Sequence, residues 1–397
     1  LPSGHLTFHS GNDNFFTHIL GKQGYSFRDA DISLTTSKAN GLTGTGYVRE
    51  FLMVKDSIRL DSIGLKLRSD GDALDYHVGV HNKKDNEYPF TGHLKGELNA
   101  EGLMAHATII DGQDKTGLDM SLRANMDDRG YKIHVVSDNS VIGYKPFSVN
   151  SGNYVYIEND HRVSADMKLK APDGTGLQIY TEDEDSTVLQ NITFSLHNLE
   201  LAQLFEILPF TPQISGVLDG DYHVIQTDRE LTVSSDMTVK NLIYEKDLFG
   251  DIGTQLVYMP KEDGSHYVDA LISKDGNDVG SLTGTYNSEG NGFLDAVFNL
   301  DRFPLQFING FIPDKLMGLR GTGEGSLTVK GPLNKLDING EVYLDSSYLY
   351  SEPYGIEMRF ANDPILIKNS RLLFENFEMF ANNDSPLNIQ GYLDFSN

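Results

Sequence analysis

The chain of 397 residues contains neither cysteine nor tryptophan. Without cysteine it can form no disulfide, no cysteine-based zinc finger and no thiol nucleophile. This absence is compatible with a protein of the bacterial envelope and does not by itself fix a compartment. The absence of tryptophan removes one of the aromatic platforms that sugar-binding surfaces use, although 19 tyrosines remain.

Basic residues and long apolar runs are also scarce. There are 32 lysines and arginines against 57 acidic residues, which gives a formal net charge of −25. Such a chain is repelled on average by phosphate backbones and anionic bilayers, so we expect no nucleic-acid partner. No window reaches the roughly 18 apolar residues of a transmembrane helix, and no signal segment opens the chain. We expect these residues to be soluble, with any membrane anchor outside them.

Glycine and the smaller aromatic residues are abundant. The 39 glycines, 19 tyrosines and 21 phenylalanines beside 13 prolines indicate many strands and turns rather than disorder. Apolar and polar residues alternate along much of the chain, for example from Leu118 to Met126 and from Val163 to Leu169. This alternation predicts half-buried strands.

Turn sequences at 69–72, 127–130, 172–174, 262–264 and 287–290 separate these strands at short intervals. They predict hairpins and therefore antiparallel pairing. Helical spacing is confined to one or two short segments, 201–208 and 304–312. So few helices cannot cover so many strands, so the sheet has to fold over itself as a sandwich, a closed barrel or an open rolled sheet. The predicted fold class is all-β, and composition does not separate these three forms.

A block near residues 194–257 recurs about 105 positions later. Gly216, Gly220 and Gly250 correspond to Gly321, Gly325 and Gly355, and residues of the same class fill the positions between them. Repetition of whole supersecondary units is typical of elongated, stacked architectures.

The second copy carries a family resemblance. The run from Leu319 to Leu344, LRGTGEGSLTVKGPLNKLDINGEVYL, is similar to the repeating pattern of the TamB family of translocation and assembly proteins, which is related to AsmA-like proteins. The short helix expected before it belongs to that pattern. The tail from Ile365 to Leu393 resembles the start of the family's C-terminal conserved domain, and richness in tyrosine and asparagine suggests a Bacteroidetes-type member.

The resemblance implies an elongated, rolled antiparallel β-sheet, called a β-taco, with an apolar groove. It divides the chain into a β-rich segment with weak repeats (1–190), one TamB/AsmA-like repeat (191–295), and a second repeat that runs into the conserved domain (296–397). The chain begins without methionine and ends inside an expected strand, so we interpret it as an internal piece of a longer protein.

The resemblance also implies a function. Family members are anchored in the inner membrane, span the periplasm and are proposed to carry phospholipids to the outer membrane along the groove. They pair with an Omp85-type barrel of the outer membrane and support the assembly of other barrels. Both the anchor and most of the partner-binding domain would lie outside these residues.

The expected lining of the groove is the inward-facing apolar set of the repeats and the tail, which would contact acyl chains because each buried methylene gains about 0.8 kcal/mol. These residues are Leu231, Val233, Met237, Val239, Leu327, Val329, Leu336, Ile338, Val342, Leu344, Ile389, Leu393 and Phe395. For any one of them ordinary core packing is the simpler interpretation, so only the set along an open groove would be functional evidence.

Enzymatic patterns are weak, and we expect no enzyme, no catalytic metal and no cofactor. The glycine-rich segment at 321–325 lacks the Gly-Lys-Ser/Thr of a phosphate loop, and the 12 histidines form no zinc-binding pair at helical spacing. Asp29, Asp70 and Asp219 each begin an Asp-x-Asp triplet that could hold calcium, but none continues into an EF-hand loop. The alternative function is an envelope β-sandwich that acts as an adhesin or a glycan-binding module.

Overall fold

The structure is a computed structural model, and it describes residues 3–11, 15–38, 41–53, 58–69, 71–136, 139–182, 188–207, 211, 213–244, 247–309, 317–351, 353–381 and 385–394. The chain falls into two units, Leu1–Ser215 (unit 1) and Gly216–Asn397 (unit 2). The fold is all-β and antiparallel, as the sequence predicted. None of the helices in the described part of the chain is long and apolar enough to cross a membrane.

Unit 1 consists of strands with two short helices. Its elements are β1 Gly4–Ser10, α1 Phe15–Lys22, β2 Tyr25–Ser26, β3 Asp29–Ser37, β4 Gly41–Met53, β5 Ile58–Ser69, β6 Ala73–His81, β7 Phe90–Asn99, β8 Gly102–Asp111, β9 Thr116–Asp127, β10 Gly130–Val135, β11 Ser140–Ile142, β12 Lys145–Val149, β13 Tyr154–Glu158, β14 Val163–Lys170, β15 Gly176–Thr181, β16 Val188–Glu200 and α2 Leu201–Phe205.

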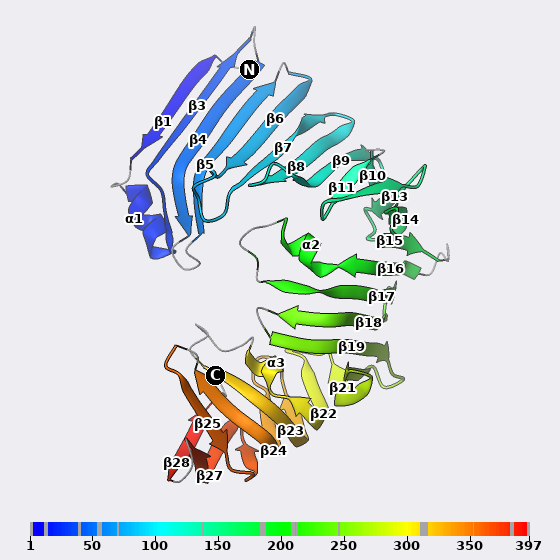
Figure 1. The fold of residues 1–397 in the computed structure, drawn as a ribbon. Helices are drawn as coiled ribbons and strands as arrows, with labels where there is room; N and C mark the ends of the chain where they lie inside the picture. Colours follow the sequence, from blue (N-terminus) through cyan, green and yellow to red (C-terminus); the bar gives the residue numbers. More distant parts are fainter. Residues whose placement is uncertain are drawn as a thin grey trace. The chain divides into compact units, whose positions relative to one another are not determined.

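Strand pairing in unit 1 follows chain order. β1 pairs with β3, and each strand from β3 to β9 is antiparallel to the next. Figure 1 shows these strands as a single curved layer. The shorter strands continue the ladder from β9 through β10, β13, β14 and β15 to β16, while β11 and β12 form a hairpin beside β9 and β14.

Unit 2 has the same construction, with one short helix among its described residues. Its elements are β17 Ile214–Thr227, which crosses the division between the units, β18 Leu231–Tyr244, β19 Asp247–Pro260, β20 His266–Lys274, β21 Asn277–Asn287, β22 Phe293–Pro304, α3 Gln306–Asn309, β23 Gly318–Gly331, β24 Asp337–Ser351, β25 Ile356–Phe360, β26 Ile365–Lys368, β27 Arg371–Phe380 and β28 Pro386–Asp394.

The strands of unit 2 also pair in chain order. β18 to β24 form one antiparallel ladder. The long strand β24 then pairs with both β25 and β26, β27 pairs with the same two strands, and β28 pairs with β27. The five turn sequences recognised above all join antiparallel neighbours, as predicted.

The helix prediction was partly wrong. α2 and α3 form within the two predicted segments but are shorter, and Leu208 and residues 310–312 lie outside the described residues. The described part of the chain has three helices rather than one or two, because α1 was not predicted. Its sequence has helical spacing of Phe15, Phe16, Ile19 and Leu20, but it extends over only 8 residues.

The 105-residue spacing of the sequence recurs in the backbone. α2 begins at Leu201 and α3 at Gln306, and left-handed residues interrupt the paired strands at Asn241 (φ 51°) and Ser346 (φ 47°). The register of β18 with β19 and of β23 with β24 shifts beside these two residues. The two copies therefore share a strand irregularity as well as their glycines.

Two glycines show why the repeat keeps this residue type. Gly220 and Gly325 have φ values of 149° and 158°, and a Cβ at either would overlap a backbone carbonyl of the neighbouring strand, that of Asp236 or Glu341. Any larger residue would strain the backbone and push the strands apart.

We expect Gly325→Ala to lower the free energy of unfolding by about 1–3 kcal/mol, because the left-handed backbone and the overlap with Glu341 act together. Urea denaturation followed by circular dichroism measures the change. Gly64→Ala in β5 is the matched control, since no atom lies within 4 Å of its added Cβ. Equal losses from both substitutions would contradict the explanation.

Candidate functional site

The strand registers place many of the apolar residues of unit 2 on one face of its sheet. Directly paired residues of neighbouring strands point to the same face. One such row, called here the central row, contains one residue from each of nine strands: Leu256, Ala270, Leu282, Phe298, Leu327, Gly340, Ile367, Leu372 and Leu393. No member of this row carries a polar side chain, and on the next strand, β18, the row ends at Ser235. We call this side of the sheet the apolar face of unit 2.

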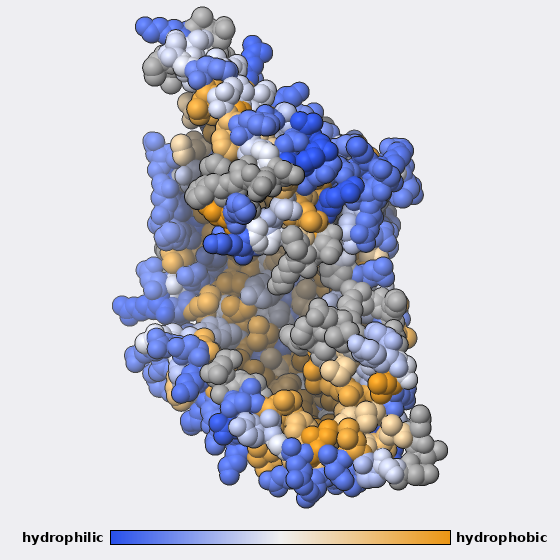
Figure 2. Space-filling model, turned by 90° about the vertical axis from the view of Figure 1, so that its left-hand side faces the viewer, coloured by the Kyte–Doolittle hydropathy of each residue, from blue (hydrophilic) through white to orange (hydrophobic). Residues whose placement is uncertain are grey.

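The opposite face is polar over β22, β23 and β24, whereas over β26, β27 and β28 it carries Leu366, Leu373 and Tyr392. Asn299, Ser326 and Glu341, each one residue away from a member of the central row, pair directly with one another across β22, β23 and β24. In the lower part of Figure 2, where unit 2 lies, hydrophobic residues gather in a hollowed surface with hydrophilic residues along its margin. The alternation of the sequence thus separates into one apolar and one polar side.

The described residues of the predicted groove lining all belong to strands of unit 2 or adjoin one. Leu231, Val233, Met237 and Val239 lie on β18, Leu327 and Val329 on β23, Ile338, Val342 and Leu344 on β24, and Ile389 and Leu393 on β28, while Leu336 lies immediately before β24. Register and strand alternation place the strand residues on the apolar face. Phe395 lies outside the described residues.

Burial divides this set in two. Val342 and Leu344 are buried in a cluster with Leu305, Phe360 and Phe377. Leu327 and Ile389 pack against the same cluster, and Val233 is also buried. These five lining residues therefore pack in the interior of unit 2 and expose little surface to a ligand.

The remaining residues keep part of their surface exposed. Met237, Val239, Val329 and Ile338 are half-buried, and Leu393 is 61% exposed. The lining role of the set remains a prediction, and the half-buried members are the ones able to fulfil it.

Sequence reasoning missed an aromatic cluster on unit 2. Phe307 of α3 stacks on Phe249 of β19 with ring centroids 5.2 Å apart, and it contacts Phe303 at 5.3 Å. Phe303 in turn packs edge-on against Phe298 of the central row at 6.0 Å. The Asn309 side chain accepts a hydrogen bond from Leu319 N (2.7 Å) and donates one to Leu319 O (3.1 Å), which fixes α3 beside β23. In the sequence, the close spacing of Phe298, Phe303 and Phe307 was the pattern from which this cluster could have been predicted.

Unit 1 has an apolar face of its own. One row runs across eight strands through Phe8, Ile32, Gly46, Leu65, Val78, Leu94, Ala107 and Met120. Much of this face is accessible, since Leu65 is 36% exposed, Leu94 43% and Leu98 46%. The prediction named no lining residue here, although it recognised the alternation that contains Met120.

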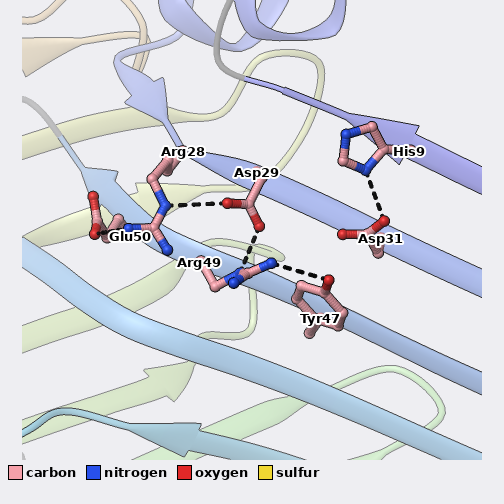
Figure 3. Close-up of polar contacts among 7 residues, drawn as sticks. All are labelled: His9, Arg28, Asp29, Asp31, Tyr47, Arg49 and Glu50. Atoms are coloured by element: carbon pink, nitrogen blue, oxygen red, sulfur yellow. Dashed lines mark hydrogen bonds and ion pairs between the residues drawn. The ribbon is translucent and has the colours of Figure 1, made fainter.

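The other face of unit 1 carries polar networks. Figure 3 shows one of them on β1, β3 and β4. Asp29 accepts hydrogen bonds from Arg28 Nε (3.1 Å) and Arg49 Nε (2.7 Å), and Asp31 pairs with His9 at 2.7 Å. Burial by itself would raise the pKa of Asp29, but the two arginines outweigh it and lower that pKa. Hydrogen bonds from Tyr47 and His9 lower the pKa of Asp31.

This network also bears on calcium. Both carboxylates of the Asp29 triplet already have cationic or donor partners, Asp70 lies outside the described residues, and no group of three His, Asp or Glu residues in the described part of the chain could hold a metal ion. The structure therefore gives no support to a calcium site at Asp29.

Comparison with family models, with curated proteins and with solved structures found no match for this chain. The TamB/AsmA-like resemblance and the division into repeats at 191 and 296 therefore remain predictions from the sequence.

The division of the predicted lining into core and accessible residues can be tested. We expect Leu344→Ala to lower the free energy of unfolding by about 2–5 kcal/mol, because the removed side chain is only 6% exposed. Ile338→Ala in the same strand should cost clearly less, since its side chain is half-buried. Urea denaturation of both variants measures the difference, and a larger loss at Ile338 would reverse the assignment.

Removal of Arg49 should raise the pKa of Asp29 toward its usual value, because one of its two cationic partners is lost. NMR titration of the side-chain carboxyl in Arg49→Gln measures this change. In the wild type the ionised carboxylate stabilises the fold above its unfolded pKa, and this contribution is lost as the pH falls through the lowered folded pKa. Arg68→Gln, which has no contact with Asp29, should leave the titration unchanged.

Proposed function

We propose that this chain is a periplasmic bridge segment whose apolar sheet faces conduct phospholipids between the inner and the outer membrane. The observation that carries the proposal is the continuous apolar row in each unit, together with the partial exposure of its side chains. A globular domain buries such a face against a second layer. Here the leucines remain available to another apolar molecule.

The surface area supports this proposal. The chain exposes 23786 Å², whereas two separate compact proteins of half its mass would together expose about 18,700 Å². This difference does not depend on how the units are arranged. Among the described residues the two hydrophobic clusters are small, with six and three buried members, so much of the apolar surface lies outside them.

The chemistry of the faces fits acyl chains. Each methylene of a lipid gains about 0.8 kcal/mol when it leaves water, so a mainly apolar face can hold an acyl chain without recognising its length. Weak, repeated contacts of this kind also let the lipid move on. Acidic residues are kept to the other side of the sheet, as Asp295 and Glu341 are, where they would not repel a headgroup in the groove.

The cellular setting of the proposal rests on the resemblance to TamB-like proteins. In that setting the full-length protein is anchored in the inner membrane and meets an Omp85-type barrel through parts outside these residues. The alternative, an adhesin or glycan-binding sandwich, requires two sheets sealed over a common core. The accessible leucines of unit 1 favour the conduit over that alternative.

Site-specific photo-crosslinking in cells tests the proposal in both units. We expect a photo-reactive residue at Ile338 or Leu94 of the full-length protein to yield phospholipid adducts, because both positions lie on the apolar faces. Asn339 and Lys95, the next residues on the opposite faces, are the matched controls. Adducts at neither apolar position, or equal adducts at all four, would refute the conduit.

A further inference from the structure

A histidine lies on the apolar face of unit 2. His266 is the first residue of β20, and it pairs directly with Pro260 of β19 and Tyr286 of β21. The register that puts Ala270 in the central row puts His266 on the same face. It stands at the margin of the sheet, beside the turn between β19 and β20.

The surroundings of this imidazole leave one nitrogen unused. The ring stacks on Tyr258 with centroids 4.6 Å apart and planes 5° from parallel. Its Nδ1 atom is buried and has no hydrogen-bond partner among the described residues. Buried polar atoms are almost always paired, so an unpaired one points to a missing partner. By contrast His9, His81 and His106 on the polar face of unit 1 each contact a side-chain oxygen.

Two phenols complete the group. Tyr258 stacks on the imidazole, and Tyr286 is its direct neighbour on the next strand. Burial raises the pKa of Tyr258, and Tyr286 raises it further, so its hydroxyl stays protonated at neutral pH. An imidazole N–H and two hydroxyls are donors suited to the oxygens of an anion. We call His266, Tyr258 and Tyr286 the margin cluster.

We propose that the margin cluster binds the phosphodiester of a phospholipid whose acyl chains lie on the apolar face of unit 2. This inference rests on the proposed conduit function and adds a headgroup site to it. Because Nδ1 is buried, the imidazole has to turn to present it to the ligand. A phosphate oxygen then accepts the hydrogen bond of His266 Nδ1, in the tautomer that carries its proton there, and the phenols donate to the remaining oxygens.

The dimensions suit this placement. Beyond His266, β20 continues to Lys274, a distance of about 26 Å at 3.3 Å per residue. Val268, Ala270 and Ile272 face the apolar side along this length. The hydrocarbon of one bilayer leaflet is about 15 Å thick, half of the 30 Å core. A phosphate at the margin therefore leaves room for complete acyl chains on the apolar face.

The test compares lipids that differ only in the phosphate. The purified chain is incubated with vesicles that contain equal amounts of dioleoylphosphatidylglycerol and dioleoylglycerol, and the lipid retained after gel filtration is measured by mass spectrometry. We expect the wild type to retain about tenfold more of the phospholipid, as suits charge-assisted hydrogen bonds. His266→Phe preserves the stacked ring and should abolish this preference, and Tyr286→Phe should reduce it.

The matched control is Tyr267→Phe, since Tyr267 lies on the opposite face and its hydroxyl donates to Asp269 at 3.0 Å. It should keep the preference of the wild type. Equal retention of both lipids by the wild type and by His266→Phe would overturn the headgroup site and leave the conduit standing. Retention of neither lipid would overturn the conduit itself, and with it the site.

Inorganic phosphate distinguishes a lipid headgroup from a free anion. Titration of the chain with phosphate, followed by the NMR signals of the His266 ring, should show binding at least tenfold weaker than that of the phospholipid, because the acyl chains contribute most of the affinity. Equally tight binding of phosphate would overturn the assignment to a lipid.

Discussion

The structure depends on one constraint, which is that the long strands have an apolar side and the described part of the chain has only three short helices to cover it. Strands that pair in chain order add their apolar residues to the same face, so the face grows with each hairpin. Ala270, Leu282 and Phe298 show this growth over three consecutive strands. Where the sheet packs on itself, as around Leu344 and Phe377, a small core forms. Elsewhere the face remains accessible, and this property leads to the proposed function.

The residues of the apolar face differ in burial and in polarity, which suggests that they have different roles. The cluster around Val342 and Leu344 stabilises unit 2, and half-buried residues such as Ile338 offer surface. The aromatic group around Phe303 and the margin cluster at His266 lie on the same face and differ in polarity. A lipid on this face would thus meet aliphatic side chains along its length and donors at one edge. Residues that stabilise unit 2 and residues proposed to contact lipid are thus neighbours on the same strands.

Much of the fold could be predicted from the sequence because its information is local. Alternation identified the strands, turn residues identified the hairpins, and glycines such as Gly220 marked the repeat. α1 was missed because eight residues give too short a pattern to stand out from an apolar strand. The size of the face was also missed, since glycines such as Gly284 interrupt the alternation of β21, and only the strand register shows that they continue the same face.

The sequence also could not show which lining residues are buried and which are half-buried, and the reason is different. Val342 and Ile338 have the same local pattern, and their difference in burial comes from Phe360 and Phe377 on strands that follow later in the chain. Likewise nothing in the sequence around His266 shows that its ring lies on an apolar face, because this follows from pairing with Pro260 and Tyr286. Contacts between strands decide both cases, and single-strand periodicity does not contain them.

The glycines of the apolar faces have a mechanical consequence. Gly44, Gly46, Gly92 and Gly96 in unit 1, and Gly280, Gly284, Gly323 and Gly340 in unit 2, all pair with apolar residues on the apolar side. At these positions the apolar side has no side chain, so the lining is thinner there than where a leucine or phenylalanine stands. A sheet that is thinner at points along one face bends more easily toward that face. These glycines would thus favour curvature with the apolar surface on the inside of the bend.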